Sequence, residues 1–202
     1  MNAKVLSSVY HKVRDACLQP SNIFGFGIWS HHIRPMIDTA RELAPLYDAD
    51  QEMVLLCVLL HDYAGISNKA LIEEHHKHGA DEARRILSAH AYPVDRITII
   101  SDAILVHRGS IPGEKNTNVA RCLADCDAIS HIQQFPSLYR VIYRDPSRSI
   151  DDGARWVKRK LERDWSKLSP AGRDYIRDTY THLMKVIISV ESSSIADAEP
   201  EW

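Results

Sequence analysis

The sequence lacks most of the features that mark secreted, membrane-bound and redox-active proteins. It has four cysteines among 202 residues, and none of them forms a CxxC pair, so we expect reduced thiols rather than a disulfide framework. No stretch approaches the ~18 consecutive apolar residues of a membrane span, and the first residues lack the apolar core of a signal peptide. We therefore expect a cytoplasmic protein with no membrane partner.

The charge balance gives no sign of a nucleic-acid partner either. The formal net charge is −2 with histidine neutral, so no excess of basic residues is available for a phosphate backbone. Charged residues make up 26% of the chain and hydrophobic residues 45%, which is the usual balance of a globular protein. The eleven histidines are the anomaly, because they cluster in the middle of the chain.

Almost every segment has the apolar spacing or the capping residues of a helix. The expected helices cover about 3–18, 29–47, 51–62, 68–89, 96–107, 117–133, 150–165 and 170–190, with a short helix between Pro136 and Pro146 and loops at 64–67 and 109–116. The sequence shows no convincing alternation of the kind that strands have. It therefore predicts an all-α protein.

These helices are expected to form one domain, a single helical bundle over residues 1–191. Its core is predicted at about 29–133, followed by C-terminal helices at 150–190. The polar and acidic residues 192–202 are predicted to be a disordered tail. The basic run Lys158–Arg163 reads as a solvated helix face, and Trp156 reads as a core anchor of the C-terminal helices.

Seven consecutive apolar residues, Val54–Leu60, lead directly into His61 and Asp62. A run of this kind is a fully buried segment, so the two polar groups that end it are expected to lie deep in the protein. Burying a carboxylate without a partner costs several kcal/mol of folding free energy or more. A divalent cation is one partner that offsets this cost. The rest of the chain is therefore expected to supply further ligands to this pair.

Other predicted helices also carry imidazole or carboxylate groups in an otherwise apolar context. These residues are His32, His75, His76, His107, Asp125 and Asp127. Mixed nitrogen and oxygen ligands suit a divalent first-row metal, whereas oxygen-only sites suit magnesium or calcium and thiolate sites suit zinc. We therefore predict that the helices bring such side chains to the His61–Asp62 pair around a metal.

This order of residues resembles the HD-domain superfamily of metal-dependent phosphohydrolases, whose pattern is H…HD…D across a helical bundle. The resemblance covers roughly residues 32–131, about half of the chain. Its matching pieces are His32, the pair His61-Asp62, and Asp127. The resemblance implies that these four residues hold a divalent metal.

Two further segments, Glu74–Ala80 and Ile104–Ser110, resemble the extra histidine segments of HD proteins that bind a second metal or a phosphate. They make His75, His76 and His107 candidates for that second site. The pattern leaves the ion open between manganese, iron, nickel, zinc and magnesium, and leaves its count at one or two.

Three ligand positions have a close rival in the sequence: His31 for His32, Asp125 for Asp127, and His76 for His75. His32 is favoured because it shares a helix face with Met36 and Ala40. Asp127 is favoured because Asp-Ala before a small-residue helix is similar to the family pattern. The choice between His75 and His76 stays open.

The resemblance implies hydrolysis of a phosphate ester or anhydride in a nucleotide or another small phosphorylated metabolite. The ion would lower the pKa of a bound water toward ~7 and polarise a phosphoryl oxygen. Asp62 would bridge a second ion, and Asp127 or Asp62 would orient the attacking water. Arg108 would neutralise charge on the phosphoryl oxygens.

Two other classes remain open at this stage. The same ligand set carries a di-iron oxygenase centre in one branch of the superfamily, and iron content with a visible absorption band would reveal it. The fold also serves as a non-catalytic regulatory module, which would need an absent or inert metal site. The sequence leaves a homo-oligomer open as well.

Overall fold

The computed structural model describes residues 1–108 and 114–192, and over these residues the chain is helical with no strand. The α-helices are α1 (Ala3–Leu18), α2 (Arg34–Leu46), α3 (Gln51–Leu60), α4 (Tyr63–Ser67), α5 (His75–Ala89), α6 (Val94–Leu105), α7 (Asn118–Gln133), α8 (Pro136–Ile142), α9 (Ile150–Lys167) and α10 (Pro170–Ser192). The all-α prediction is confirmed. The predicted tail from residue 193 onward and residues 109–113 of the predicted loop lie outside the described residues.

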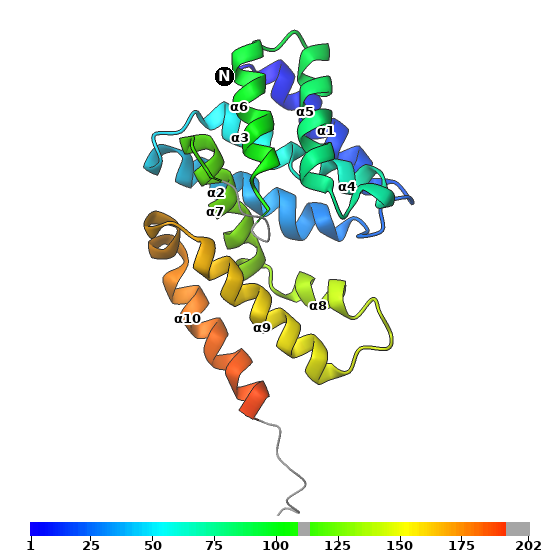
Figure 1. The fold of residues 1–202 in the computed structure, drawn as a ribbon, viewed down its shortest axis with the longest axis vertical. Helices are drawn as coiled ribbons and strands as arrows, with labels where there is room; N and C mark the ends of the chain where they lie inside the picture. Colours follow the sequence, from blue (N-terminus) through cyan, green and yellow to red (C-terminus); the bar gives the residue numbers. More distant parts are fainter. Residues whose placement is uncertain (109–113, 193–202) are drawn as a thin grey trace, which may run out of the picture.

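Helix α7 connects the two halves of the bundle (Figure 1). It packs against α2, α3 and α6 of the N-terminal part and against α9 and α10 of the C-terminal part. Most of its residues are buried, including the polar Asp125, Asp127 and Ser130. Because water cannot reach these groups freely, each needs a partner within the protein or a bound cation.

Helix α3 delivers the His61–Asp62 pair to the centre of the bundle. Asp50 caps its first turn by accepting a hydrogen bond from the Met53 amide at 3.0 Å, and the apolar run Val54–Leu60 is entirely buried. The helix ends at Leu60, two residues earlier than predicted, with His61 as its C-terminal cap. The pair therefore sits in the turn between α3 and α4 rather than inside a helix.

Two predicted boundaries are wrong because packing overrides local propensity. The predicted loop at 64–67 is part of helix α4 (Tyr63–Ser67), in which Ala64, Gly65 and Ile66 are buried and which packs against α1 and α5. The predicted helix at 68–89 begins only at His75, after a 3-10 turn at Lys69–Leu71. A separate finding concerns membranes: within the described residues, no helix combines the length and the apolar character that a membrane crossing needs.

The predicted helix at 29–47 is split by a change of winding. Its first turn, Trp29–Ile33, is a π-helix that leads into α2. A π-turn rotates the side chains that precede it relative to those of the following α-helix, and such turns are frequent at functional sites. His32 lies in this turn and is buried.

Helices α9 and α10 form an antiparallel pair below the rest of the bundle (Figure 1). Trp165 of α9 stacks on Tyr180 of α10 with ring centroids 4.2 Å apart. The prediction that Lys158–Arg163 is a solvated face is wrong at Lys160, whose Nζ lies 2.8 and 2.6 Å from the two carboxylate oxygens of Asp164. This lysine turns inward because α9 packs against α7.

Candidate metal centre

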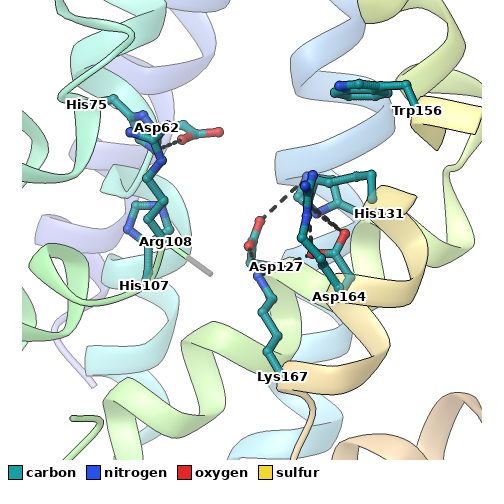
Figure 2. Close-up of a pocket in the computed structure, with 11 residues that line it drawn as sticks. Asp62, His75, His107, Arg108, Asp127, His131, Trp156, Asp164 and Lys167 are labelled. Atoms are coloured by element: carbon teal, nitrogen blue, oxygen red, sulfur yellow. Dashed lines mark hydrogen bonds and ion pairs between the residues drawn. The ribbon is translucent and has the colours of Figure 1, made fainter. Parts of the chain in front are cut away.

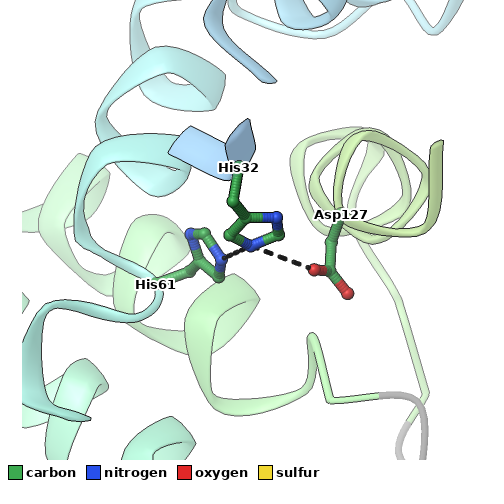
Figure 3. A group of neighbouring side chains, drawn as sticks. All are labelled: His32, His61 and Asp127. Carbon is green, nitrogen blue, oxygen red and sulfur yellow. Dashed lines mark hydrogen bonds and ion pairs between the residues drawn. The ribbon is translucent and has the colours of Figure 1, made fainter. Parts of the chain in front are cut away.

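Three side chains from three different elements converge at the centre of the bundle (Figure 3). His32, His61 and Asp127 each offer one ligand atom, and these atoms lie within 4.8 Å of one another. The two Nε2 atoms are 3.2 Å apart, and Oδ1 of Asp127 lies 3.6 Å from Nε2 of His32. All three residues are buried, so their polar atoms face each other rather than solvent.

Hydrogen bonds fix which nitrogen of each imidazole carries its proton. Nδ1 of His61 donates to the Val58 carbonyl at 2.8 Å. Nδ1 of His32 lies 3.1 Å from Oγ of Ser130, and that hydroxyl donates to the His32 carbonyl at 3.2 Å, so it accepts from the ring. In their neutral forms both rings therefore present the Nε2 lone pair to each other and to carboxylates, and a bound cation or an added proton between them stabilises this arrangement.

Asp62 connects this group to a second set of imidazoles. Its Oδ2 lies 3.5 Å from Nε2 of His32 and 3.3 Å from Nε2 of His61, whereas its Oδ1 lies 3.4 Å from Nε2 of His75. His107 forms a further group with His61 and Asp62. The two carboxylate oxygens of Asp62 therefore face two neighbouring groups of ligands, as a bridging carboxylate does.

The histidines of the second set are oriented in the same way as His61. Nδ1 of His75 bonds the Ile72 carbonyl at 2.8 Å, and Nδ1 of His107 bonds the Ile104 carbonyl at 2.6 Å. In each case the bond to a carbonyl three residues earlier uses Nδ1 and leaves Nε2 as the ring nitrogen free to bind an ion. A backbone bond to the second ring nitrogen is the usual support of a metal-binding histidine.

The electrostatics of the cluster favour a bound cation. Burial alone would raise the pKa of the Asp62 carboxyl, but His61 and His32 outweigh it and hold that pKa well below its usual range. Burial would lower the pKa of His61, but Asp62 outweighs it and raises the pKa to about 9. Burial and the nearby His61 lower the pKa of His107 to about 3. In the metal-free protein a proton on His61 therefore supplies the positive charge.

The structure shows which of the alternative ligand residues in the sequence lie in the cluster. His31 is exposed and bonds Gln134 at 3.3 Å, so it does not join the cluster that His32 enters. Asp125 accepts bonds from the Tyr47 hydroxyl and, at 2.7 Å, from the Ser169 hydroxyl. It thereby joins the end of α2 to the start of α10.

His75, and not His76, reaches Asp62. His76 is buried on α5, and its Nδ1 has no hydrogen-bond partner among the described residues. The α5 backbone comes close to the cluster at Gly79, where an added Cβ would lie 3.0 Å from the His61 carbonyl oxygen. A side chain at this position would therefore push the turn that carries His61 away by a few tenths of an ångström, and glycine avoids this.

A pocket of about 340 Å³ opens over the cluster. Figure 2 shows its two walls, one carrying Asp62, His75, His107 and Arg108 and the other formed by side chains of α7 and α9. We call it the charged pocket; its lining residues are Asp62, His75, His107, Arg108, Asp127, His131, Trp156, Lys160, Arg163, Asp164 and Lys167. Arg108 bonds the Glu73 carbonyl, which holds its guanidinium at the rim.

An ionic network on the α7–α9 side was missed from the sequence. Nζ of Lys167 donates to Oδ2 of Asp127 at 2.7 Å, so that Oδ1 faces His32. Nδ1 of His131 lies 3.1 Å from Asp164, and its ring stacks on His32 with centroids 4.9 Å apart. Burial would raise the pKa of Asp127, but Lys167 and His131 hold it well below its usual range.

A signal for this network exists in the sequence. Trp156, Lys160, Arg163, Asp164 and Lys167 follow one another at steps of four, three, one and three residues, and residues so spaced share one face of a helix. That face turns to α7. Trp156, predicted to be a core anchor, is half-buried, packs against the hydrophobic core and also lines the charged pocket.

Replacing each member of the His31–His32 pair separately tests this geometry. We expect His32→Ala to lose tight binding of manganese, because it removes a nitrogen from the centre of the cluster. His31→Ala should bind the ion as the wild type does, since its ring bonds only Gln134 in this neighbourhood. Isothermal titration of both metal-stripped variants measures the difference, and equal loss in the two would contradict the assignment.

Comparisons with known proteins agree with the geometry. The family model of the HD domain matches residues 29–132. A crystal structure described as a predicted HD superfamily hydrolase, from an uncultured Thermotogales bacterium, has a similar fold, with a TM-score of 0.57 and 18% sequence identity. The similarity covers 95% of this chain and 91% of that chain. No curated protein matches the sequence significantly.

Proposed function

The chain belongs to the HD-domain family, a superfamily of metal-dependent hydrolases, and from this premise we propose that it is a metal-dependent phosphohydrolase of small phosphorylated metabolites. The observation that carries the proposal is the convergence of two buried imidazoles and two carboxylates at one point, with the Nε2 atoms of both rings facing acidic oxygens. Mixed nitrogen and oxygen ligands of this kind suit a divalent first-row metal.

In this proposal His32, His61, Asp62 and Asp127 hold one ion. His75 and His107, with Asp62 as the bridge, hold a second. A divalent ion bound there would act as a Lewis acid on a phosphoryl oxygen and lower the pKa of water. Lys167 supports the first set because it occupies Oδ2 of Asp127 and leaves Oδ1 directed at His32.

The basic side chains of the charged pocket would bind the phosphoryl group. Arg108 lies on one wall (Figure 2). Lys160 and Arg163 of α9 also line the pocket. Guanidinium and ammonium groups form strong, charge-assisted hydrogen bonds to phosphate oxygens. They would hold the phosphoryl group over Asp62 and Asp127, and those carboxylates would orient the water that attacks it.

Phosphate release from a substrate panel tests the proposal. The protein, stripped of metal and reloaded separately with manganese, iron, nickel, zinc or magnesium, would be assayed on nucleotides and other phosphorylated metabolites. We expect phosphate release from at least one class of compound that requires the ion and is lost on stripping. No release with any ion, or oxygen uptake by the iron form without phosphate release, would contradict the proposal.

Proton release gives an independent test of ion binding at His61. The raised pKa of about 9 means that Nε2 of His61 is protonated in the metal-free protein at neutral pH. An ion must displace this proton, so we expect release of about one proton per site at pH ~7.5 and about tenfold weaker binding for each pH unit below ~9. Titration with manganese in two buffers of different ionisation enthalpy measures the protons released. No release would contradict the displacement of a proton from His61 by the ion.

A further inference from the structure

A second cavity adjoins the charged pocket and is lined by side chains of a different kind. Its volume is about 690 Å³, and its apolar walls are Phe24, Ile28, Pro136, Leu138, Val141 and Trp156. We call it the apolar chamber. The segment before the π-turn, helix α8 and helix α9 supply these walls. Its size lies within the usual range for cavities that bind small molecules.

The apolar chamber and the charged pocket share part of their walls. Asp62, His75, His131, Trp156 and Lys160 line both. Figure 2 shows Trp156 next to His131 on the α9 side, facing across from the Asp62 wall. A molecule held at Asp62 therefore lies beside the apolar chamber and can extend into it.

Beyond the walls shared with the charged pocket, the polar lining of the apolar chamber consists of His31, His32, Gln134, Ser137 and Arg140. His31 and Gln134 bond to each other at 3.3 Å, and His32 belongs to the metal cluster. Among the described lining residues, Asp62 is the one carboxylate, and it belongs to the metal cluster. A sugar or polyol packed on the apolar walls would lose hydration without hydrogen-bond partners there to replace it.

The walls favour a flat aromatic group. Trp156 and Phe24 supply aromatic rings, and His31 and His131 add imidazoles. Aromatic groups pack well on such rings through offset or edge contacts, and the contacts add to the free energy of apolar burial. The adjoining Lys160 and Arg163, by contrast, suit an anion.

We propose that the substrate is an aryl phosphate, that is, a phosphate ester of an aromatic alcohol. Its flat aromatic group would be held in the apolar chamber against Trp156. The proposal rests on the proposed function for the phosphoryl end, which lies in the charged pocket. Hydrolysis would break the bond between phosphorus and the ester oxygen and form one to the oxygen of water. A proton from that water would leave on the released aryl alcohol, with inorganic phosphate as the second product.

Phenyl and naphthyl phosphate test the proposal, because their leaving groups are similar in acidity and differ in apolar size. Their non-hydrolysable phosphonates would be titrated into the metal-loaded protein, and the phosphates would be assayed for KM. We expect the naphthyl compounds to bind roughly tenfold more tightly, from the extra apolar surface buried. The comparison would be repeated with Val141→Asp, which places a carboxylate in the chamber, and with the matched control Val94→Asp.

Val141 and Val94 are both suited to this substitution, since their side chains are 42% and 78% exposed and folding should tolerate the change. We expect Val141→Asp to abolish the naphthyl preference and Val94→Asp, which lies outside the chamber, to keep it. Equal binding of the two phosphonates by the wild type, or an unchanged preference in Val141→Asp, would overturn the inference. Preferred binding with no hydrolysis of these compounds or of the substrate panel would instead overturn the proposed function, and hydrolysis without preference would overturn the inference alone.

Discussion

Asp62→Asn is expected to abolish hydrolysis while leaving the helical bundle folded. Asparagine keeps the shape of the side chain but removes the negative charge that faces His32, His61 and His75. Since this carboxylate lies between both groups of ligands, its loss removes part of each ion site. We expect kcat/KM for the best phosphorylated substrate to fall by about 10³-fold, with the helical circular dichroism signal unchanged.

A second aspartate provides the control for this variant. Asp102 lies on the exposed side of α6 and pairs only with Arg84 in the described structure, at 3.1 Å. Asp102→Asn should retain wild-type kcat/KM. Wild-type hydrolysis by Asp62→Asn, or an equal loss in both variants, would remove Asp62 from the centre.

Lys167→Met is expected to destabilise the metal-free protein strongly. The lysine is 10% exposed and lies 2.7 Å from Asp127 and 3.5 Å from Asp164. Methionine fills similar space but leaves two buried carboxylates without this partner. Breaking a buried ion pair in this way costs about 3 kcal/mol or more, which lowers Tm by about 10 °C in a domain of this size.

Two controls accompany the Lys167→Met variant: the manganese-loaded protein and a substitution of an exposed lysine. A bound cation would give Asp127 a new partner, so the loss of Tm in Lys167→Met should be smaller in the manganese-loaded protein. Lys77 is 56% exposed and pairs with Glu74 within one helix turn, so Lys77→Met should change stability by less than ~0.5 kcal/mol. Thermal denaturation with and without manganese measures both effects. Equal Tm values for the two lysine variants would contradict the buried network.

The His61–Asp62 pair could be predicted from the sequence because two polar residues directly follow a segment that must be buried. The apolar run Val54–Leu60 must be buried, and it ends in His61 and Asp62, so these groups had to meet partners inside the protein. The helical class followed for a similar reason, since apolar spacing repeats over nearly every segment. Both inferences depend on patterns along the chain and need no knowledge of how the helices rotate.

The choice between two adjacent candidate ligands, by contrast, depends on how each helix is rotated about its own axis. The sequence pattern alone does not fix that rotation. Neighbouring residues on a helix point about 100° apart, so His31 and His32 cannot both face the centre. Both lie in the π-turn at Trp29–Ile33, and His32 is the one that is buried there. His75 and His76 likewise point in different directions at the start of α5, where the helix packs closely on the His61 turn at Gly79. His75 reaches Asp62.

The contribution of α9 was missed for a different reason. Its basic residues resemble a solvated face, and only the packing of α9 against α7 shows that Lys160 and Lys167 point inward. Charge alone is an ambiguous signal, because a long side chain can reach either solvent or a buried carboxylate. The shared helix face of Trp156, Asp164 and these lysines was the more informative pattern.

The metal content of the purified protein tests the central claim most directly. Wild type and His61→Ala would be stripped, incubated with excess manganese, desalted and analysed for metal. We predict one or two ions per chain in the wild type and a loss of this stoichiometric metal in His61→Ala, because Nε2 of His61 belongs to both groups of ligands. A wild-type protein without metal, or a variant with undiminished metal content, would contradict the account.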